Sequence, residues 1–151
     1  MIVRNIMSHK NLSLSPSSTV REAAEIMRDK DVAALPVRGD GRPLGLVTDR
    51  EIVVRLLPEG CDAGARPVSD AMTREPVSCY ADQDVAEAAA IMGDDQVRHL
   101  LVLERSGDLA GVLSIEDIAE NASEELAGQA LGEIVEKRAS PESPAYVRRP
   151  R

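Results

Sequence analysis

Residues 20–37 read VREAAEIMRDKDVAALPV, and residues 85–102 read VAEAAAIMGDDQVRHLLV. Ten of these 18 positions are identical at an offset of 65 residues, and the apolar spacing is kept. The likeness extends outward on both sides: Val3 and Met7 recur as Val68 and Met72, and, after one extra residue, GLVT at 45–48 recurs as GVLS at 111–114. A match of this length across several elements indicates two copies of one supersecondary unit.

Two such copies are expected to form one module. Each spans fewer than 60 residues and would leave much of its apolar surface in water, so we expect the copies to pack face to face about a pseudo-two-fold axis. The organisation that follows is repeat 1 at 1–57, a linker at 58–66, repeat 2 at 67–122, a helical extension at 123–139 and a mobile tail at 140–151.

Within each copy the pattern predicts the order β-α-β-β-α and therefore an α+β fold. In the first copy, Leu12 to Leu14 alternates as a short strand, and Thr19 with Glu22 forms a capping box ahead of a helix; Asp84 with Glu87 repeats the box in the second. The other predicted strands lie at 33–37, 43–48, 99–103 and 109–114. Helices are predicted from 49 to about 56 and from 115 onward, with a helical extension beyond Glu120 that runs to about Arg138.

Composition excludes several classes of function. The formal net charge of −8 and the presence of only two aromatic residues, both tyrosines, disfavour binding to nucleic acid. No apolar run has membrane-spanning length, and the N-terminus lacks a signal-peptide pattern, so we expect a cytoplasmic protein. Cys61 and Cys79 belong to no ligand cluster, and no metal site is predicted.

The most informative local pattern is GLVTDRE at 45–51, echoed by GVLSIED at 111–117. A glycine opens a buried strand, a hydroxyl ends it, and an acid follows in the first turn of a helix. Backbone N–H groups at such a turn can hold phosphate, and the carboxylate can accept hydrogen bonds from ribose hydroxyls. The same spacing, however, is that of an ordinary helix N-terminal capping box, and the residues alone leave both interpretations open.

The doubled unit, the strand AALPV at 33–37 and the segment GLVTDREI at 45–52 resemble the cystathionine-β-synthase (CBS) domain family. The resemblance covers roughly residues 1 to 122 and is to a stand-alone tandem pair, often called a Bateman module. It implies a disc with two related clefts that bind adenosine compounds such as AMP, ADP, ATP, S-adenosylmethionine or NAD. It also implies energy or metabolite sensing and a homodimer.

The resemblance assigns an acid and a hydroxyl to the site in each repeat, and it suggests further candidates. The ribose-binding acid falls on Asp117 in repeat 2 and on Glu51 in repeat 1, where the longer side chain departs from the family pattern; Ser114 and Thr48 match the hydroxyl on the phosphate side. The second cleft is therefore the preferred site. The further candidates, each of which has an ordinary structural alternative such as core packing or a surface ion pair, are Arg98, His99, Asp49, Arg50, Leu12, Val77 and Tyr80.

These observations predict a non-catalytic regulatory module that binds an adenosine nucleotide between its repeats, signals to a protein partner that the sequence does not identify, and requires no cofactor. The alternative is a ligand-free module for dimerisation and docking. Catalysis is disfavoured because the two histidines lie far apart in sequence, and because no paired nucleophile and base, phosphate-binding glycine loop or metal-ligand cluster is present.

Overall fold

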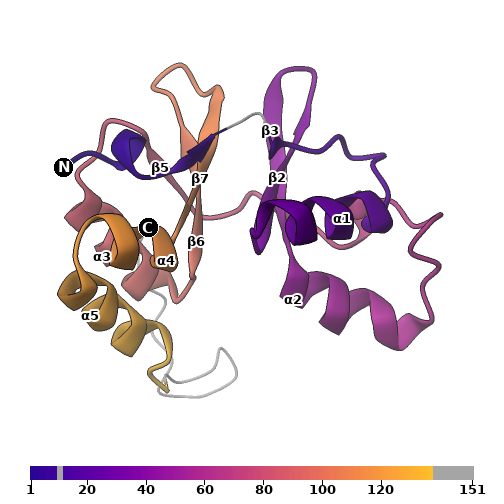
Figure 1. Ribbon diagram of the computed structural model, residues 1–151. Helices are drawn as coiled ribbons and strands as arrows, with labels where there is room; N and C mark the ends of the chain where they lie inside the picture. The colour runs from indigo at the N-terminus through magenta and orange to yellow at the C-terminus, as the bar shows by residue number, and fades with distance from the viewer. Residues whose placement is uncertain (10–11, 138–151) are drawn as a thin grey trace, which may run out of the picture.

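A computed structural model describes residues 1–9 and 12–137 of the chain. Figure 1 shows two halves side by side, each made of a small sheet with helices against it. The first half holds a three-stranded sheet of order β2-β3-β4, and the second a four-stranded sheet of order β1-β7-β6-β5. The predicted α+β architecture of two packed repeats is confirmed.

The first half contains antiparallel strands β2 (Ala34–Gly39) and β3 (Arg42–Thr48), with β4 (Thr73–Arg74) at the edge. Helix α1 (Val20–Lys30) begins at the predicted Thr19–Glu22 capping box. Helix α2 (Asp49–Glu51) continues as a π-helix over Ile52–Leu56 and a 3-10 turn over Leu57–Glu59. Its buried side chains, Ile52 and Leu56, face the first core.

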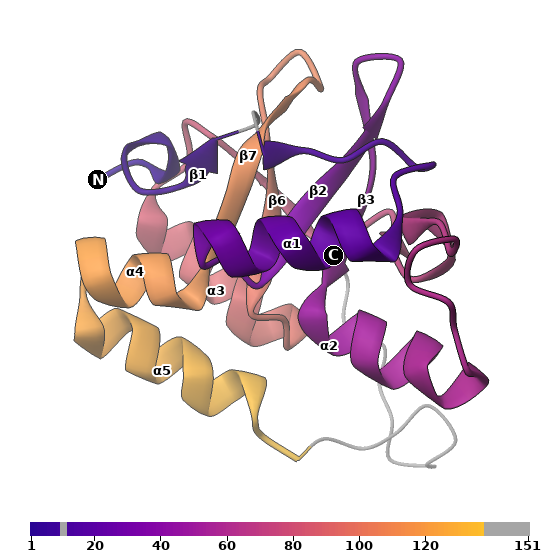
Figure 2. The same cartoon turned by 45° about the vertical axis from the view of Figure 1, so that its right-hand side comes forward.

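The second half repeats this plan. Strands β6 (His99–Leu103) and β7 (Leu109–Ser114) form an antiparallel pair, and β5 (Ser78–Tyr80) runs parallel to β6. Helices α3 (Val85–Asp95) and α4 (Ile115–Asn121) follow their counterparts in repeat 1, and α5 (Glu124–Ile134) packs on both of them. Figure 2 shows α5 alongside α4 and α3.

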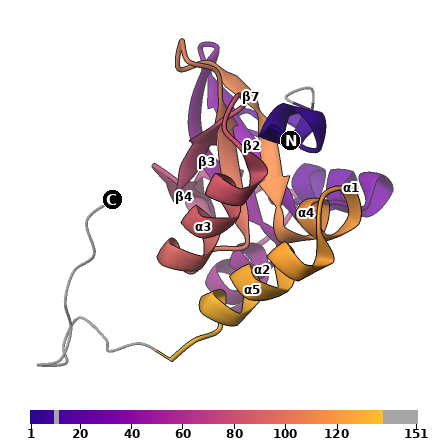
Figure 3. The same ribbon diagram turned by 90° about the vertical axis from the view of Figure 1, so that its left-hand side faces the viewer.

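The two repeats exchange the segments that precede them. Strand β1 (Ser8–His9) pairs with β7 of the second half, and β4, which precedes repeat 2, pairs with β3 of the first. Figure 3 shows the N-terminal segment lying beside β7. The apolar side chains follow the same rule, because Val3 and Met7 are buried in the second core, whereas Val68 and Met72 are buried in the first.

Glycines allow both exchanged strands to approach closely. A Cβ on Gly111 of β7 would overlap the backbone carbonyl oxygen of Ser8, and a Cβ on Gly45 of β3 would lie 2.6 Å from the carbonyl oxygen of Thr73. Gly45 and Gly111 are the glycines that open the repeated motif GLVTDRE and GVLSIED. Their absent side chains serve the docking of a strand.

A third apolar cluster joins the halves. It contains Ala34 and Leu46 from the first sheet and Leu101, Leu109 and Val112 from the second. Because these side chains lie on the facing sides of the two sheets, the halves close on each other as the repeat predicts.

The structure adds strands β1 and β4, which the sequence did not predict, and it differs from the predicted elements at further points. Leu14 forms only an isolated parallel bridge with Val37, so the strand predicted over 12–14 is reduced to one residue. The side chain of Asp84 accepts from the N–H of Ala86, and no reciprocal bond from Glu87 completes the predicted box. Helix α5 ends at Ile134, earlier than predicted. The predicted tail at 140–151 lies outside the described residues.

Candidate functional site

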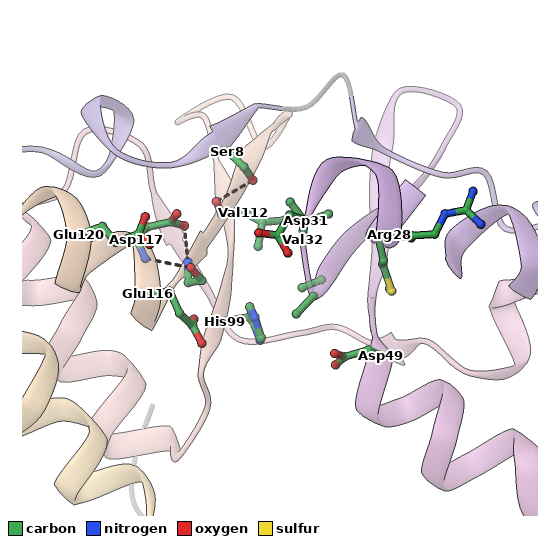
Figure 4. A pocket seen from close by; sticks show the side chains of 14 residues that line it. Ser8, Arg28, Asp31, Val32, Asp49, His99, Val112, Glu116, Asp117 and Glu120 are labelled. Carbon is green, nitrogen blue, oxygen red and sulfur yellow. Dashed lines mark hydrogen bonds between the residues drawn. The ribbon is translucent and has the colours of Figure 1, made fainter. Parts of the chain in front are cut away.

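A cavity of about 590 Å³ opens between the two halves. One wall consists of the end of α1 and the chain after it, with Val32, Ala33 and Ala34, together with Asp49 at the start of α2. The opposite wall consists of β7 and α4, and Ser8 of the exchanged strand also lines the space. Figure 4 shows side chains from both halves converging here. A molecule of this size bound in the cavity would contact both repeats at once.

The predicted hydroxyl and acid of repeat 2 lie in this cavity. Asp117 Oδ2 accepts from the backbone N–H of Ser114 at 2.8 Å, and Ser114 Oγ accepts from the N–H of Asp117 at 3.0 Å. The pair is thus a capping box. No hydrogen bond among the described residues reaches Asp117 Oδ1. One carboxylate oxygen caps the helix, and the other has no hydrogen-bond partner among the described residues.

The corresponding acid of repeat 1 is used within the protein. Glu51 Oε2 accepts from the N–H of Thr48 at 3.1 Å, and Glu51 Oε1 accepts from the hydroxyl of Thr73 at 2.5 Å. Arg55 lies 4.0 Å from the same carboxylate, whose side chain is 16% exposed. The additional methylene of glutamate carries the carboxylate to β4, so both oxygens have partners.

The structure brings four of the predicted site residues to the cavity: Asp49, His99, Ser114 and Asp117. Thr48, Arg50 and Glu51 lie outside its lining, as does the exposed Arg98. Leu12 and Val77 pack against the first and second cores, and the ring of Tyr80 lies under the guanidinium of Arg105 at 4.1 Å. Core packing therefore describes Leu12 and Val77, whereas Tyr80 is exposed and does not belong to either core.

Sequence reasoning missed five polar side chains of the lining: Ser8, Arg28, Asp31, Glu116 and Glu120. Ser8 follows the repeated Met7, but nothing local indicated that its strand crosses to the other half. Asp31 ends α1 in the left-handed conformation with φ of 52°, which turns the chain at the cavity wall. Glu116 and Glu120 are four residues apart on α4, a spacing that marks one helix face.

His99 stands between acidic groups in this cavity. Figure 4 shows its ring between Glu116 on one wall and Asp49 on the other. Burial lowers the pKa of His99 from its ordinary value of 6.5, and this effect outweighs the opposite influence of Glu116, Asp49 and Asp117; nearby Arg98 lowers the pKa further. His99 is therefore neutral at pH 7.

This pKa shift predicts a pH dependence of stability. The folded state holds a proton on His99 less readily than the unfolded state does. The unfolding free energy therefore falls as the pH drops from about 6.5 through the lowered pKa, and protonation of His99 has little effect on it at pH values well above 6.5. This contribution of His99 to the slope of unfolding free energy against pH is at most about 1.4 kcal/mol per pH unit, and the His99→Gln variant should lack it. Urea titrations of both proteins from pH 5 to 8 measure it. A difference between them that stays constant with pH contradicts the expectation.

Comparison with known proteins identifies the fold. A family model of the CBS domain matches the chain twice, over residues 3–58 and 68–124. The chain belongs to the CBS domain family. It is 35% identical over 133 residues to the CBS domain-containing protein YhcV of Bacillus subtilis, covering 87% of this chain and 94% of that protein. It is 30% identical over 122 residues to hypoxic response protein 1 of Mycobacterium tuberculosis, covering 80% and 85%.

Solved tandem CBS structures superpose on this one. The structure of CBSX2 in complex with AMP is 26% identical, with a TM-score of 0.67, and the match covers 80% of this chain and 95% of that chain. Hypoxic Response Protein I with two coordinated zinc ions is 30% identical, with a TM-score of 0.70, over 80% and 98%. In this CBS pair, no group of three metal-ligating side chains gathers within residues 1–9 and 12–137.

Two further properties describe this CBS pair. None of the helices in the described part of the chain is long and apolar enough to cross a membrane. Cys79 lies in the second core, where burial raises the pKa of its thiol to about 12. The thiol is therefore protonated at neutral pH and a poor nucleophile.

Proposed function

We propose that this tandem CBS pair is a non-catalytic regulatory module that binds one adenosine compound in the cavity bordered by Ser114 and Asp117. The observation that carries the proposal is the unused Oδ1 of Asp117, facing a cavity that both repeats line. Its counterpart Glu51 has no unused oxygen, which favours one bound molecule per chain. The AMP complex of CBSX2, a protein of the same architecture, supports the ligand class.

The lining suggests how such a ligand is held. Asp117 accepts hydrogen bonds from the ribose hydroxyls, and the small apolar surface of Val32, Ala33 and Val112 receives the base. The bound molecule contacts α1 from one half and α4 from the other. Since a ligand can shift an equilibrium only by its different affinity for the two states, a ligand that spans the seam favours one relative orientation of the repeats, which a partner protein then detects.

A thermal-shift panel tests this function. The intact protein is heated with adenosine, AMP, ADP, ATP, S-adenosylmethionine or NAD, and with guanosine and GMP as controls that change only the base. A ligand at a hundred times its dissociation constant adds about 2.7 kcal/mol, which raises Tm by roughly 5–11 °C for a chain of this size. If every adenosine compound leaves Tm unchanged, the sensing function is wrong.

A second candidate function, assembly without a ligand, is favoured by an uncovered helical surface on repeat 1. Val53, Val54 and Leu57 are each more than half exposed on the helix that begins with α2. In repeat 2, Ala119, the counterpart of Val53, packs against the core to which α5 contributes Ala127 and Ala130. Within the described chain α5 lies along α4 and not along α2 (Figure 2). We propose that a second copy of the chain covers this surface in a homodimer.

A charge introduced at the centre of the surface formed by Val53, Val54 and Leu57 tests the dimer. Val54→Asp should convert a dimer to a monomer in light scattering after gel filtration at micromolar concentration. The circular dichroism spectrum should stay that of the folded protein, because the side chain is exposed in the single chain. Leu44→Asp is the matched control, since Leu44 is 40% exposed on the β2–β3 hairpin, at the other end of the sheet from α2. A wild-type monomer, or a Val54→Asp dimer, contradicts the proposal.

A further inference from the structure

The cavity carries an unusual charge for a nucleotide site. Five carboxylates line it: Asp31, Asp49, Glu116, Asp117 and Glu120. The only arginine or lysine among its described lining residues is Arg28, whose Nε donates to Asp29 at 2.8 Å. Figure 4 shows the Arg28 side chain pointing away from the space. The charged side chains presented to a ligand are therefore all carboxylates.

His99 does not offset these charges. Its lowered pKa keeps the ring neutral at pH 7, so it offers a hydrogen bond and no positive charge. Phosphate groups are bound in proteins by arginine, lysine or several converging backbone N–H groups. At the start of α4, the N–H of Asp117 is already bonded to Ser114 Oγ. The N–H of Ile115 donates to the carbonyl of Arg98.

The carboxylates also have a definite arrangement around the ribose position. Asp117 lies at the α4 wall, and Glu116 and Asp49 project from opposite walls on either side of His99 (Figure 4). Glu116 and Asp49 both line the cavity and are exposed. A substituent that extends from a ribose held at Asp117 toward His99 would meet these two carboxylates. A positive group there gains from both charges, whereas a phosphate is repelled by both.

We propose that the ligand of this cavity is an adenosyl compound that carries a cationic group, such as a sulfonium or a protonated amine, in place of a phosphate. The proposal rests on the proposed function and specifies the ligand class of the same site. Asp117 holds the ribose, and Asp49 and Glu116 flank the cation. Metal-free polyphosphates are the ligands that this arrangement most strongly disfavours.

Pairs of compounds that differ in one charged group provide the test. Calorimetry at pH 7.5 in EDTA compares S-adenosylmethionine with S-adenosylhomocysteine, which lacks the sulfonium charge, and adenosine with AMP. A cation near two partly solvated carboxylates gains roughly 0.2–1 kcal/mol from each, so the sulfonium compound should bind about 2- to 30-fold more tightly than the thioether. AMP should bind more weakly than adenosine. Raising the salt concentration from 50 to 500 mM should narrow both differences.

Two double variants, each of which removes two negative charges, test whether the preference for the sulfonium compound arises in the cavity. Asp49→Asn with Glu116→Gln should reduce the preference for the sulfonium compound to within about twofold and should strengthen AMP binding. The control is Glu25→Gln with Glu125→Gln, which removes the same net charge from two exposed positions outside the cavity. It should keep the wild-type preference. Equal effects of the two double variants would mean that net charge, and not the cavity, sets the preference.

The outcomes separate this proposal from the proposed function. If AMP or ATP binds more tightly than S-adenosylmethionine, the module still senses an adenosine compound and only the cationic ligand is wrong. If ATP binds tightly only after Mg²⁺ replaces EDTA, the carboxylates hold a metal with a phosphate, which also overturns the proposal. If no adenosine compound binds, the proposed function itself fails.

Discussion

Asparagine in place of Asp117 is expected to weaken the binding of an adenosine compound by about 10- to 150-fold. The substitution removes the charge from hydrogen bonds to the ribose, each of which is worth about 1.5–3 kcal/mol when one partner is ionised, and 1.4 kcal/mol corresponds to a factor of ten. The helix should survive, because the amide oxygen of asparagine can still accept from the N–H of Ser114. Calorimetry with the best ligand of the panel measures the loss.

Glu51→Gln is the matched control for Asp117→Asn, since the two acids occupy equivalent positions of the repeats. The carboxylate of Glu51 is occupied by Thr48 and Thr73, so this variant should lose some stability and keep its affinity for the ligand. If Glu51→Gln weakens binding and Asp117→Asn does not, the ligand lies in the other cleft.

Gly111→Ala should cause a large loss of stability, larger than that of Gly45→Ala, because its Cβ comes closer to the backbone of the exchanged strand. The new Cβ would occupy the position of the Ser8 carbonyl oxygen, so β1 must move off β7. Overpacking costs about 1–3 kcal/mol, and loss of burial of Val3 or Met7 adds about 1.5–3 kcal/mol for each side chain released. We expect a destabilisation of about 3 kcal/mol or more, equivalent to a Tm lower by roughly 6–12 °C.

Hydrogen exchange shows where this loss arises. In Gly111→Ala the amides of Val3 and Arg4, which donate to the carbonyls of Gln83 and Ala81 at 2.9 Å, should exchange faster than in the wild type. Gly128→Ala is the control, because open space surrounds this position on α5; it should stabilise the helix by up to about 1 kcal/mol. A Gly111→Ala protein with wild-type Tm and protection would show that β1 does not need the glycine.

Much of this fold could be predicted from the sequence because the chain repeats itself. The helical stripes and the strands at 99–103 and 109–114 follow from local periodicity, and the structure has those two strands at the same bounds. The exchange of β1 and β4 could not be predicted in this way. It depends on contacts between residues far apart in sequence, such as Ser8 with Val112 and Gly45 with Arg74, and no local pattern records them.

The site was predictable in part for the same reason. Ser114 and Asp117 belong to a short motif, so sequence placed them together, and the structure places them at the cavity. Sequence also distinguished Glu51 from Asp117 by its longer side chain. That both oxygens of Glu51 have partners needed the structure, because one of them is bonded by Thr73, which reaches Glu51 from an exchanged strand. The acidity of the cavity likewise arises from both halves, since Asp31 and Asp49 join Glu116, Asp117 and Glu120 only after the repeats close.

The crossing of β1 also orders events during synthesis of the chain. Residues 1–9 leave the ribosome about 100 residues before their partner strand, which spans Leu109–Ser114. At translation rates of about 5–20 residues per second, that partner is made roughly 5–20 seconds later. Until then Val3 and Met7 lack the second core that buries them in the folded protein, so this segment is exposed to chaperones and proteases throughout that interval. A bulky insertion beside β1 would therefore disturb a late step of folding, the docking of β1 on β7.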